Sequence, residues 1–589
     1  MEQFVNYGII VVYMLVIIGV GFFFTNRHET TENYLLGGRN MPFAAIGISM
    51  LMTLFSSISL VQVPGEIVNY GWTLFSLGYL TLFMAIPYYL LFVRFYFKLG
   101  SFTPYEYLEY RYDRTVRVVV ASAAFYTRIM YIGTVLFTSS KIFEGAYQWP
   151  AWLTIVIVGT IGVLYTVMGG MKAVVWTDVI QFVVLFGGLF FILYTLHQNV
   201  EGGLVGGILY AFHNGHGASD YLNPDFYKLT PYVRLCFWLM LWNALFTCMG
   251  DVSSDQLNVQ RILSTKDWKT GFKSQILSTA LAMSVCVILE VIGFAVFSYY
   301  AHNPDPMLPE GSGDLALFRF IATKMPMPIP GIFMAAMLAA IMSTLDSGMN
   351  SMATVWLKEF HAKFIHKNMT SAEEVRVSRW ATVAVGGFAI LLGLGLNFCG
   401  SWLQQSVTEI WTILTLLGTA TLPAFLFAVL SKRANSMLIW AYCFFAIGES
   451  AGKNIWYILS RKAVQTWNAD PTAGLGWGGK LDEIYVWIPF IAGVLLLLPW
   501  LVAKGQKTLH HTIPALGGMF VLGITFYTFL WYIYSHLYVT DKPLESSFAF
   551  FLPCSLIVAF IALWFCPVQP EHKWRGLTLA TVDEPIINK

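Results

Sequence analysis

Charged residues are scarce in this sequence. Of its 589 residues, only 12% are charged, whereas 57% are hydrophobic and 20 are Trp. Soluble proteins average about 25% charged residues, so the composition excludes an ordinary soluble domain and predicts a polytopic membrane protein. The formal net charge of +2 favours neither a nucleic-acid partner nor an acidic one.

Motifs of catalysis and metal binding are also missing. The chain has no GxxxxGK[ST] loop of an ATP-driven pump and no HExxH pair, and most of its 11 His residues fall in expected loops and tails. Its seven Cys residues lie in or beside apolar segments without CxxC spacing, which favours reduced packing residues over a metal site. We therefore expect no enzyme, but a transporter, a channel or a transporter-like solute sensor.

Apolar stretches of about 20 residues recur along the chain and predict about fifteen membrane spans, an all-α fold. Their expected limits are 4–24, 43–70, 74–97, 116–146, 150–168, 173–196, 231–250, 274–300, 330–357, 378–398, 408–430, 436–459, 483–503, 514–536 and 547–566. The first run is followed by TNRHETTEN and not by a small-residue cleavage site, which indicates a retained span.

Lys and Arg gather in three loops, at 97–117, 251–273 and 358–379. Even numbers of spans separate these loops, so they lie on one side of the membrane, and the positive-inside rule makes that side the cytoplasm. The N-terminus is then expected outside and the C-terminus in the cytoplasm. Short loops and the lack of a large external domain favour a bacterial inner membrane, that is, the cell membrane.

A polar stripe interrupts the long apolar helix expected between Ala335 and Glu359. Residues three, four and seven apart share one face of a helix. The stripe therefore consists of Ser343, Asp346, Ser347 and Asn350. An ionisable residue inside a membrane is a functional candidate, and hydroxyl and carboxylate oxygens suit a small hard cation. The stripe predicts a cation site.

The span at 43–70 contains helix-breaking residues. Ser57 and Gln62 are followed by Pro64 and Gly65, which predict a broken helix at that pair with Gln62 beside the break. Such breaks occur where freed backbone groups face protein or a watery cavity, and transporters bind ions and solute there. A simple proline kink packed by small residues remains the alternative.

Four passages resemble motifs of one membrane protein family. They are NYLLGGRNMP at 33–42, YTVMGGMKA within 159–181, SSDQLNVQRILSTKD at 253–267 and GIFMAAMLAAIMSTLDSGMNSMAT at 331–354. Together they are similar to the sodium/solute symporter family, the family of sodium/glucose, proline, pantothenate and sialic acid symporters.

The resemblance implies a sodium-coupled symporter that works by alternating access. It implies a LeuT-type core of ten helices in a five-plus-five inverted repeat at 43–431. Residues 1–42 would hold the first span and a cytoplasmic loop, 432–566 about four peripheral spans, and 567–589 a cytoplasmic tail. Sodium is the implied coupling ion, and the partners are a small organic solute and the lipid bilayer, with no nucleic acid and no obligate protein partner.

The resemblance also implies a sodium site. Its ligands here are the main-chain carbonyls of Phe55, Ile58 and Ala340 and the hydroxyls of Ser343 and Thr344. The alternative for the hydroxyls is that each bonds back to the carbonyl four residues earlier.

Some members of the family have a second sodium site. The matching residues here are Asp178, Ser343, Asp346 and Ser347. Asp346 departs from the family pattern, because a carboxylate stands where a hydroxyl is used. Two neighbouring carboxylates would repel each other, so we expect a second sodium ion, a shared proton or a basic partner, Arg128 or Lys141, to relieve them.

The solute is less defined by the sequence. Gln62 matches a sugar-contacting position of the family, whereas the family's Asn and Lys contacts appear here as Cys248 and Ala282. The candidate contacts are Ser57, Gln62, Asn243, Cys248, Asp251 and Glu290, with Trp72, Tyr79 and Tyr88 as possible stacking faces. We expect a monosaccharide, a sugar acid such as sialic acid, or a polyol; a monocarboxylate or amino-acid-type substrate is the alternative.

Overall fold

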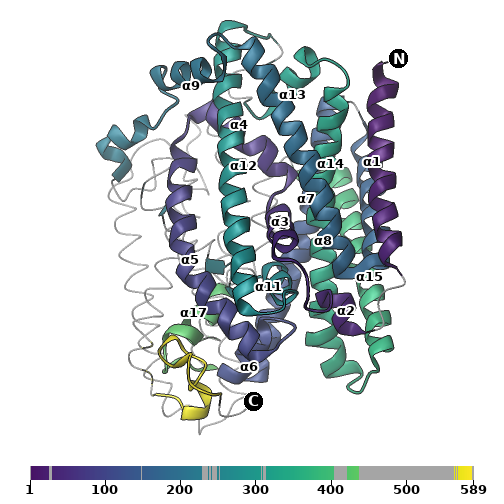
Figure 1. The fold of residues 1–589 in the computed structure, drawn as a ribbon, viewed down its shortest axis with the longest axis vertical. Helices are drawn as coiled ribbons and strands as arrows, with labels where there is room; N and C mark the ends of the chain where they lie inside the picture. Colours follow the sequence, from purple (N-terminus) through teal and green to yellow (C-terminus); the bar gives the residue numbers. More distant parts are fainter. Residues whose placement is uncertain are drawn as a thin grey trace, which may run out of the picture. The chain divides into compact units, whose positions relative to one another are not determined.

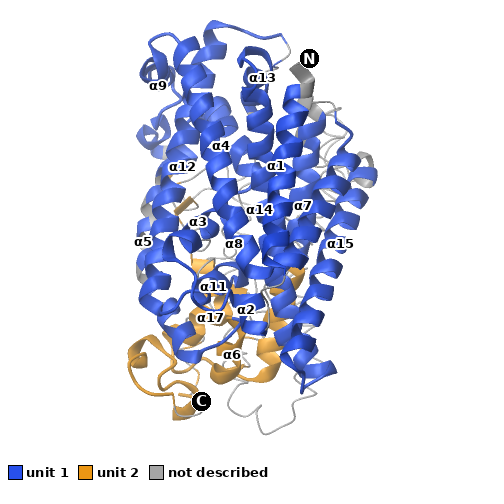
Figure 2. Cartoon of the chain, turned by 45° about the vertical axis from the view of Figure 1, so that its right-hand side comes forward, with its two compact units in different colours: residues 1–103, 128–226, 255–411 blue, residues 104–127, 227–254, 412–589 orange. Residues whose placement is uncertain are grey.

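The computed structural model describes residues 2–25, 30–147, 149–227, 253–306, 313–403, 421–436 and 568–586, with a few single positions between these ranges. The expected spans between 436 and 566, and most of the one at 231–250, lie outside the described residues. The chain divides into two compact units. Unit 1 comprises residues 1–103, 128–226 and 255–411, and unit 2 comprises 104–127, 227–254 and 412–589 (Figure 2).

The described residues form helices and no strand, as the sequence predicts (Figure 1). The long helices are α1 (Glu2–Phe24), α5 (Thr73–Leu99), α7 (Arg114–Tyr147), α8 (Ala151–Asn199), α12 (Trp268–His302), α14 (Ile329–Val355) and α15 (Ser371–Leu403). Six helices in the described part are long and apolar enough to cross a membrane, and a bent pair makes up to seven. These helices confirm a multi-span membrane protein.

The bent pair is the broken span expected at 43–70. It consists of α3 (Phe43–Leu54) and α4 (Ser57–Tyr70), which meet at 64°. The prediction of a break was right, but its place was wrong. Phe55 and Ser56 are the extended residues, with ψ of 110° and 167°, and Pro64 lies inside α4.

Backbone geometry explains this displacement. Proline fixes φ near the helical value. Pro64 therefore fits the backbone of α4, and its main effect is to leave one helical carbonyl without its N–H donor. Ser56 takes the extended conformation typical of a residue that precedes a helix. Gln62 therefore lies within α4, exposed and more than one turn from the break.

The expected spans at 150–168 and 173–196 form the two parts of α8. Gly170 separates them with φ 56° and ψ −155°, a conformation outside the helical region. A side chain is also excluded there by space, because a Cβ on Gly170 would lie 2.7 Å from the carbonyl oxygen of Tyr34. The glycine of the YTVMGGMKA motif thus provides the non-helical kink between the two parts of α8.

Several connections treated as loops in the sequence contain short helices. These are α2 (Thr31–Leu36), α9 (Gly203–His213), α11 (Gln256–Leu263) and α13 (Gly313–Lys324), with the 3₁₀ turns η1 (Ser219–Leu222) and η2 (Pro224–Tyr227) and the π-helix η3 (Trp356–Ile365). Acidic side chains start two helices: Asp255 accepts from the Leu257 amide and Asp267 from the Thr270 amide. The Thr270 amide also lowers the pKa of Asp267.

Helix α14 is the buried centre of unit 1. All of its residues from Pro330 to Val355 are buried except Ile332. It packs against α8, α1, α15, α3 and α11, and Figure 1 shows α1, α8 and α15 beside it. A helix with apolar residues around most of its circumference is typical of such a buried position. The polar stripe of α14 therefore faces other parts of the protein.

Unit 2 has its own polar contacts in its described part. It contains α6 (Tyr105–Arg111), α17 (Thr421–Leu430) and the short turns η7 (Glu571–Lys573) and η8 (Leu579–Thr581). The buried Arg111 donates to the carbonyls of Ala428 at 2.8 Å and Lys573 at 3.1 Å. The segment that the sequence predicts as a tail is thereby tied to α6 and α17.

Candidate cation and solute sites

Asp178 on α8 is the first centre of the polar cluster in unit 1. Its Oδ1 accepts a hydrogen bond from Ser343 of α14, and its Oδ2 accepts one from Ser49 of α3, both at 2.5 Å. Asp178 and Ser343 are fully buried. The carboxylate therefore joins three helices through hydroxyl donors.

Asp346 on α14 is the second centre. Tyr165 of α8 donates to its Oδ2 at 2.8 Å, and Ser347 donates to its Oδ1 at 3.1 Å. Thr177, also on α8, lies 3.4 Å from Oδ2. The structure thus brings together all four residues predicted for the second cation site, although Asp178 and Asp346 come from different helices.

Arg261 supplies the positive charge of this cluster. Its Nε donates to Ser49 at 2.7 Å, and its Nη2 donates to Ser347 and lies 3.4 Å from Asp178 Oδ2. The side chain is 1% exposed. The sequence predicted a basic partner for the two carboxylates, but it named Arg128 or Lys141 and not Arg261.

The two predicted basic partners pair elsewhere. Arg128 forms a salt bridge with Asp255, and Lys141 forms one with Glu144 at 2.7 Å. Both lie on α7, and hydropathy pointed to them because they interrupt an apolar run. Arg261 instead comes from a connection that the sequence places at the cytoplasmic surface.

The residues expected at the shared sodium site lie on neighbouring elements. Phe55 is at the break, Ile58 is in the first turn of α4, and the remaining three lie on α14, which packs against α3 and α4. Thr344 Oγ1 donates to the Ala340 carbonyl at 3.1 Å, the back-bond named as its alternative. The last carbonyls of α3 have no helical donor beyond the break, so oxygen atoms are available there to a cation.

The structure describes only some of the residues predicted to contact the solute. Asn243, Cys248 and Asp251 lie outside the described residues. Ser57 is buried next to the break and shares a hydrogen bond of 2.5 Å with Ser139 of α7. Gln62 is exposed.

Glu290 is buried on α12 and has two neutral donors. Trp72 Nε1 donates to one carboxylate oxygen at 2.9 Å, and the Tyr79 hydroxyl donates to the other at 2.7 Å. Trp72 and Tyr79, which the sequence suggested as stacking faces for the solute, are therefore hydrogen-bond donors to Glu290, a residue predicted to contact the solute. The contact ties the start of α5 to α12.

Removal of one donor to Glu290 should destabilise the protein. We expect Trp72→Phe to lower the free energy of unfolding by about 1.5–3 kcal/mol, because a buried carboxylate loses a hydrogen bond, and to leave the solute KM unchanged. Thermal unfolding and uptake kinetics measure both, with Trp152→Phe, at a side chain 47% exposed, as the control. A higher KM with unchanged stability would instead indicate that Trp72 and Glu290 contact the solute.

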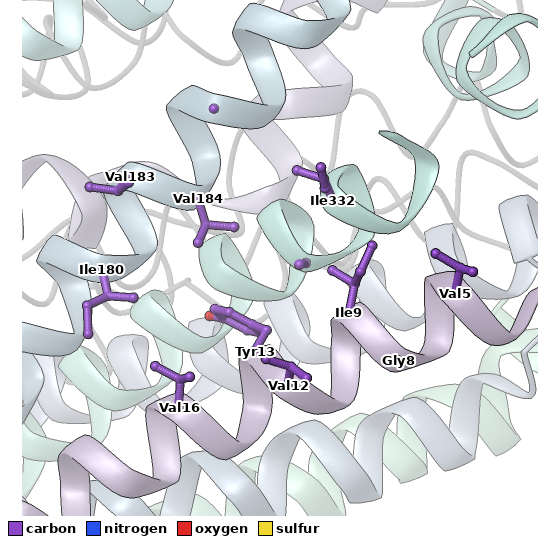
Figure 3. A pocket seen from close by; sticks show the side chains of 12 residues that line it. Val5, Gly8, Ile9, Val12, Tyr13, Val16, Ile180, Val183, Val184 and Ile332 are labelled. Carbon is purple, nitrogen blue, oxygen red and sulfur yellow. The ribbon is translucent and has the colours of Figure 1, made fainter. Parts of the chain in front are cut away.

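One groove in the described part of unit 1 is lined by residues other than those of the Asp178–Asp346 cluster. This groove of about 590 Å³ lies between α1, α8 and α14, lined by Val12, Val16, Val184, Ile332 and others (Figure 3). Apart from the Tyr13 hydroxyl, its side chains carry no polar atom. Such a surface offers no ligand to an ion or a polar solute.

Some residues of the cluster were missed by the sequence analysis. Ser49 and Thr53 lie one turn apart on α3, where Thr53 Oγ1 is 3.1 Å from Ser347 Oγ. Tyr165 and Arg261 both fall inside motifs that carried the family resemblance. Their presence in those motifs was an available signal, but no spacing rule connects them to Asp178.

Comparison with solved structures identifies the fold. A sodium-coupled sialic acid symporter in its substrate-bound outward-open state matches with a TM-score of 0.69 at 24% identity, covering 76% of this chain and 91% of that one. The fold is therefore LeuT-type, with all-α architecture and a broken span. The family profile narrows this further.

The chain belongs to the sodium:solute symporter family, whose profile matches residues 34–437. It is 26% identical to the sodium/sialic acid symporter NanT of Aliivibrio fischeri, over 73% of this chain and 84% of that protein. It is 26% identical to SiaT of Proteus mirabilis, over 74% and 86%, and 28% identical to the rabbit sodium-dependent multivitamin transporter, over 69% and 63%. The protein is thus a multi-pass membrane symporter that couples a small organic solute to sodium.

Proposed function

We propose that sodium binds where the broken span meets α14. The ligands would be the carbonyls of Phe55, Ile58 and Ala340 and the hydroxyls of Ser343 and Thr344. The observation that carries this proposal is the break at Phe55–Ser56 beside a buried helix that bears two adjacent hydroxyls. The chain would carry out transport and no covalent catalysis.

We propose the solute to be a sugar acid such as sialic acid, or a related monosaccharide or polyol. The names of the two sialic acid symporters among the relatives support this class. A helix N-terminus attracts anions, and α4 begins at the break without a side-chain cap, which suits a carboxylate group. A monocarboxylate or amino-acid-type substrate, or solute sensing without transport, is the alternative.

We infer a second cation site at Asp178, Ser343, Asp346 and Ser347. Two buried carboxylates face one guanidinium there, so one positive charge is missing when both are ionised. A second sodium ion or a proton would supply it. Sodium dependence of uptake at several pH values, in the native protein and in Asp346→Ser, distinguishes these two cations.

Sodium and solute would bind with positive coupling. Sodium at the break would hold α3 and α4 against α14 and so favour the arrangement that receives the solute. Moving one charge down a potential of about 100 mV provides about 2.3 kcal/mol. Core helices at 43–431 would perform this cycle in the cell membrane, with peripheral spans at 432–566, the N-terminus outside and the C-terminus in the cytoplasm.

Uptake into proteoliposomes tests the proposal. We expect labelled sialic acid to accumulate only with an inward sodium gradient, and Ser343→Ala and Thr344→Ala each to raise the sodium concentration for half-maximal uptake about tenfold, as loss of a ligand worth about 1.4 kcal/mol would. Ser351→Ala is the control, because Ser351 is a buried hydroxyl on the same helix with no hydrogen-bond partner among the described residues. Binding without accumulation would favour a sensor.

A further inference from the structure

A short helix in the connection after α8 turns an apolar face outward. On α9, Val205, Leu209 and Phe212 share that face, because residues three, four and seven apart are neighbours on a helix. Their exposed fractions are 67%, 54% and 45%. Soluble proteins rarely leave such a group of large apolar side chains in water, so the face requires a partner that is itself apolar.

The opposite face of α9 is packed against the protein. Its buried residues are Gly203, Gly207 and Ala211. A Cβ on Gly207 would lie 3.2 Å from the backbone of Ala295, so the missing side chain allows α9 to approach α12 closely. Ala211 packs in an apolar cluster with Ile67 of α4, and Figure 1 shows α9 beside the ends of α4 and α12. These contacts fix the rotation of α9 and leave its apolar face outside.

Charge and length both suit a position along a membrane surface. Between Glu201 and Asp220 the sequence has no Asp, Glu, Lys or Arg. With its 11 residues, α9 is about 16 Å long, whereas the apolar layer of a bilayer is about 30 Å thick. The helix is therefore too short to cross the membrane and has no charged side chain that would hold it in water.

The exposed apolar surface of α8 continues into this face. Phe190 and Tyr194 lie near the end of α8 with exposed fractions of 57% and 64%, and α8 is apolar and long enough to cross a membrane. Because α8 ends at Asn199 and α9 begins at Gly203, the connection reaches at most about 14 Å. Helix α9 therefore begins close to the depth at which α8 leaves the bilayer.

The segment after α9 holds the corner between α4 and α5. The Trp72 amide donates to the His216 carbonyl at 3.1 Å, and the Thr73 hydroxyl donates to the Asp220 carboxylate at 2.6 Å. A Cβ on Gly71 would lie 2.8 Å from the His216 carbonyl oxygen, so the two backbones are in close contact. Since α4 is the second half of the broken span, a displacement of α9 is passed on to that span.

We propose that α9 lies in the bilayer interface, with Val205, Leu209 and Phe212 among lipid acyl chains, and anchors the end of the broken span to the membrane. An interfacial helix is held there by the apolar area that it buries. The contacts of the following segment with Trp72 and Thr73 join this anchor to the corner of α4 and α5. The anchor is separate from the proposed sodium and solute sites.

Nitroxide spin labels test the depth of α9 in the full-length protein, reconstituted into phosphatidylcholine vesicles. Labels at Val205→Cys and Leu209→Cys should collide with oxygen, which concentrates among acyl chains, more often than with a water-soluble nickel chelate. Leu222→Cys is the matched control, because Leu222 is 87% exposed on η1 of the same connection and should collide mainly with the chelate. The native protein treated with the same reagent gives the background of its seven Cys residues.

Three results of this measurement would overturn the proposal. Labels on α9 that collide mainly with the nickel chelate would place the face in water. Labels shielded from both reagents would show that protein covers the face, and shielding that disappears on dilution with lipid would identify a second copy of the chain. A label at Leu222 that behaves like those on α9 would show that the contact with lipid is not specific to the helix.

A charge on the exposed face tests the anchoring. Leu209→Glu should increase the collisions of a label at Val205→Cys with the chelate and slow solute uptake several-fold, because a carboxylate is costly among acyl chains. Leu222→Glu should leave both as in the native protein. A displaced α9 with native uptake would contradict its link to the broken span, and an undisplaced α9 would contradict its insertion. The label measurement needs neither sodium nor solute, so its result is independent of the proposed function.

Discussion

Replacement of Asp178 by Asn should abolish sodium-dependent uptake and lower the melting temperature. Asp178 accepts hydrogen bonds from Ser49 and Ser343 and faces Arg261. Removing one partner of a buried ion pair leaves the other charge uncompensated and costs about 3–5 kcal/mol, a large part of the total stability of about 5–15 kcal/mol of a typical protein. The same change removes a carboxylate ligand from the proposed second cation site.

A second variant separates stability from ion binding in this prediction. Asp178→Asn/Arg261→Gln removes both charges, so it should regain much of the melting temperature and still lack sodium-dependent uptake. Asp305→Asn is the control, because Asp305 pairs with Arg319 at a partly exposed position where a pair contributes little. Native sodium dependence in Asp178→Asn would contradict the placement of Asp178 in the ion pathway.

Substitution of Gly170 should prevent the normal folding of the α8 region. Its φ of 56° with ψ of −155° lies in a region populated essentially by glycine. In Gly170→Ala the new Cβ would meet the Tyr34 carbonyl oxygen at 2.7 Å and the Tyr34 ring at 2.8 Å. Backbone strain alone costs about 1–3 kcal/mol, and the close contact with Tyr34 adds to it, so we expect little folded protein in the membrane.

Gly187 on the same helix provides the matched control. A Cβ there meets no atom within 4 Å, so Gly187→Ala should be neutral or should stabilise α8 by about 0.5–1 kcal/mol. Size-exclusion profiles in detergent and thermal unfolding compare the two variants. Equal yields of folded protein from both would show that the turn at Gly170 tolerates a side chain.

Local signals in the sequence predicted part of the candidate site. Ser343, Asp346 and Ser347 were expected together because helical spacing alone places them on one face of α14. Asp178 was assigned to the same site only because of the family resemblance. Hydropathy does not predict that two helices far apart in the chain lie next to each other. The structure brings these residues into one cluster, whereas their role as ion ligands stays a prediction.

The two errors have different physical causes. Pro64 is a strong local signal, yet the break occurs at Phe55–Ser56, because a proline is tolerated inside a helix whose packing compensates one lost hydrogen bond. Arg128 is prominent within an apolar run, yet it pairs with Asp255. The position of the break follows from local backbone geometry, whereas the pairing of Arg128 depends on a neighbour that is remote in sequence.

The sequence by itself determined that this is a multi-span helical membrane protein of the sodium:solute symporter type, because hydropathy, helical periodicity and motifs are local properties of the chain. Only the tertiary structure decided which positive charge enters the buried cluster. Arg261 lies in a connection with the polarity of a cytoplasmic loop, and it reaches Asp178 because α11 is buried against α3, α12 and α14. That placement follows from long-range packing, which no local pattern of residues encodes.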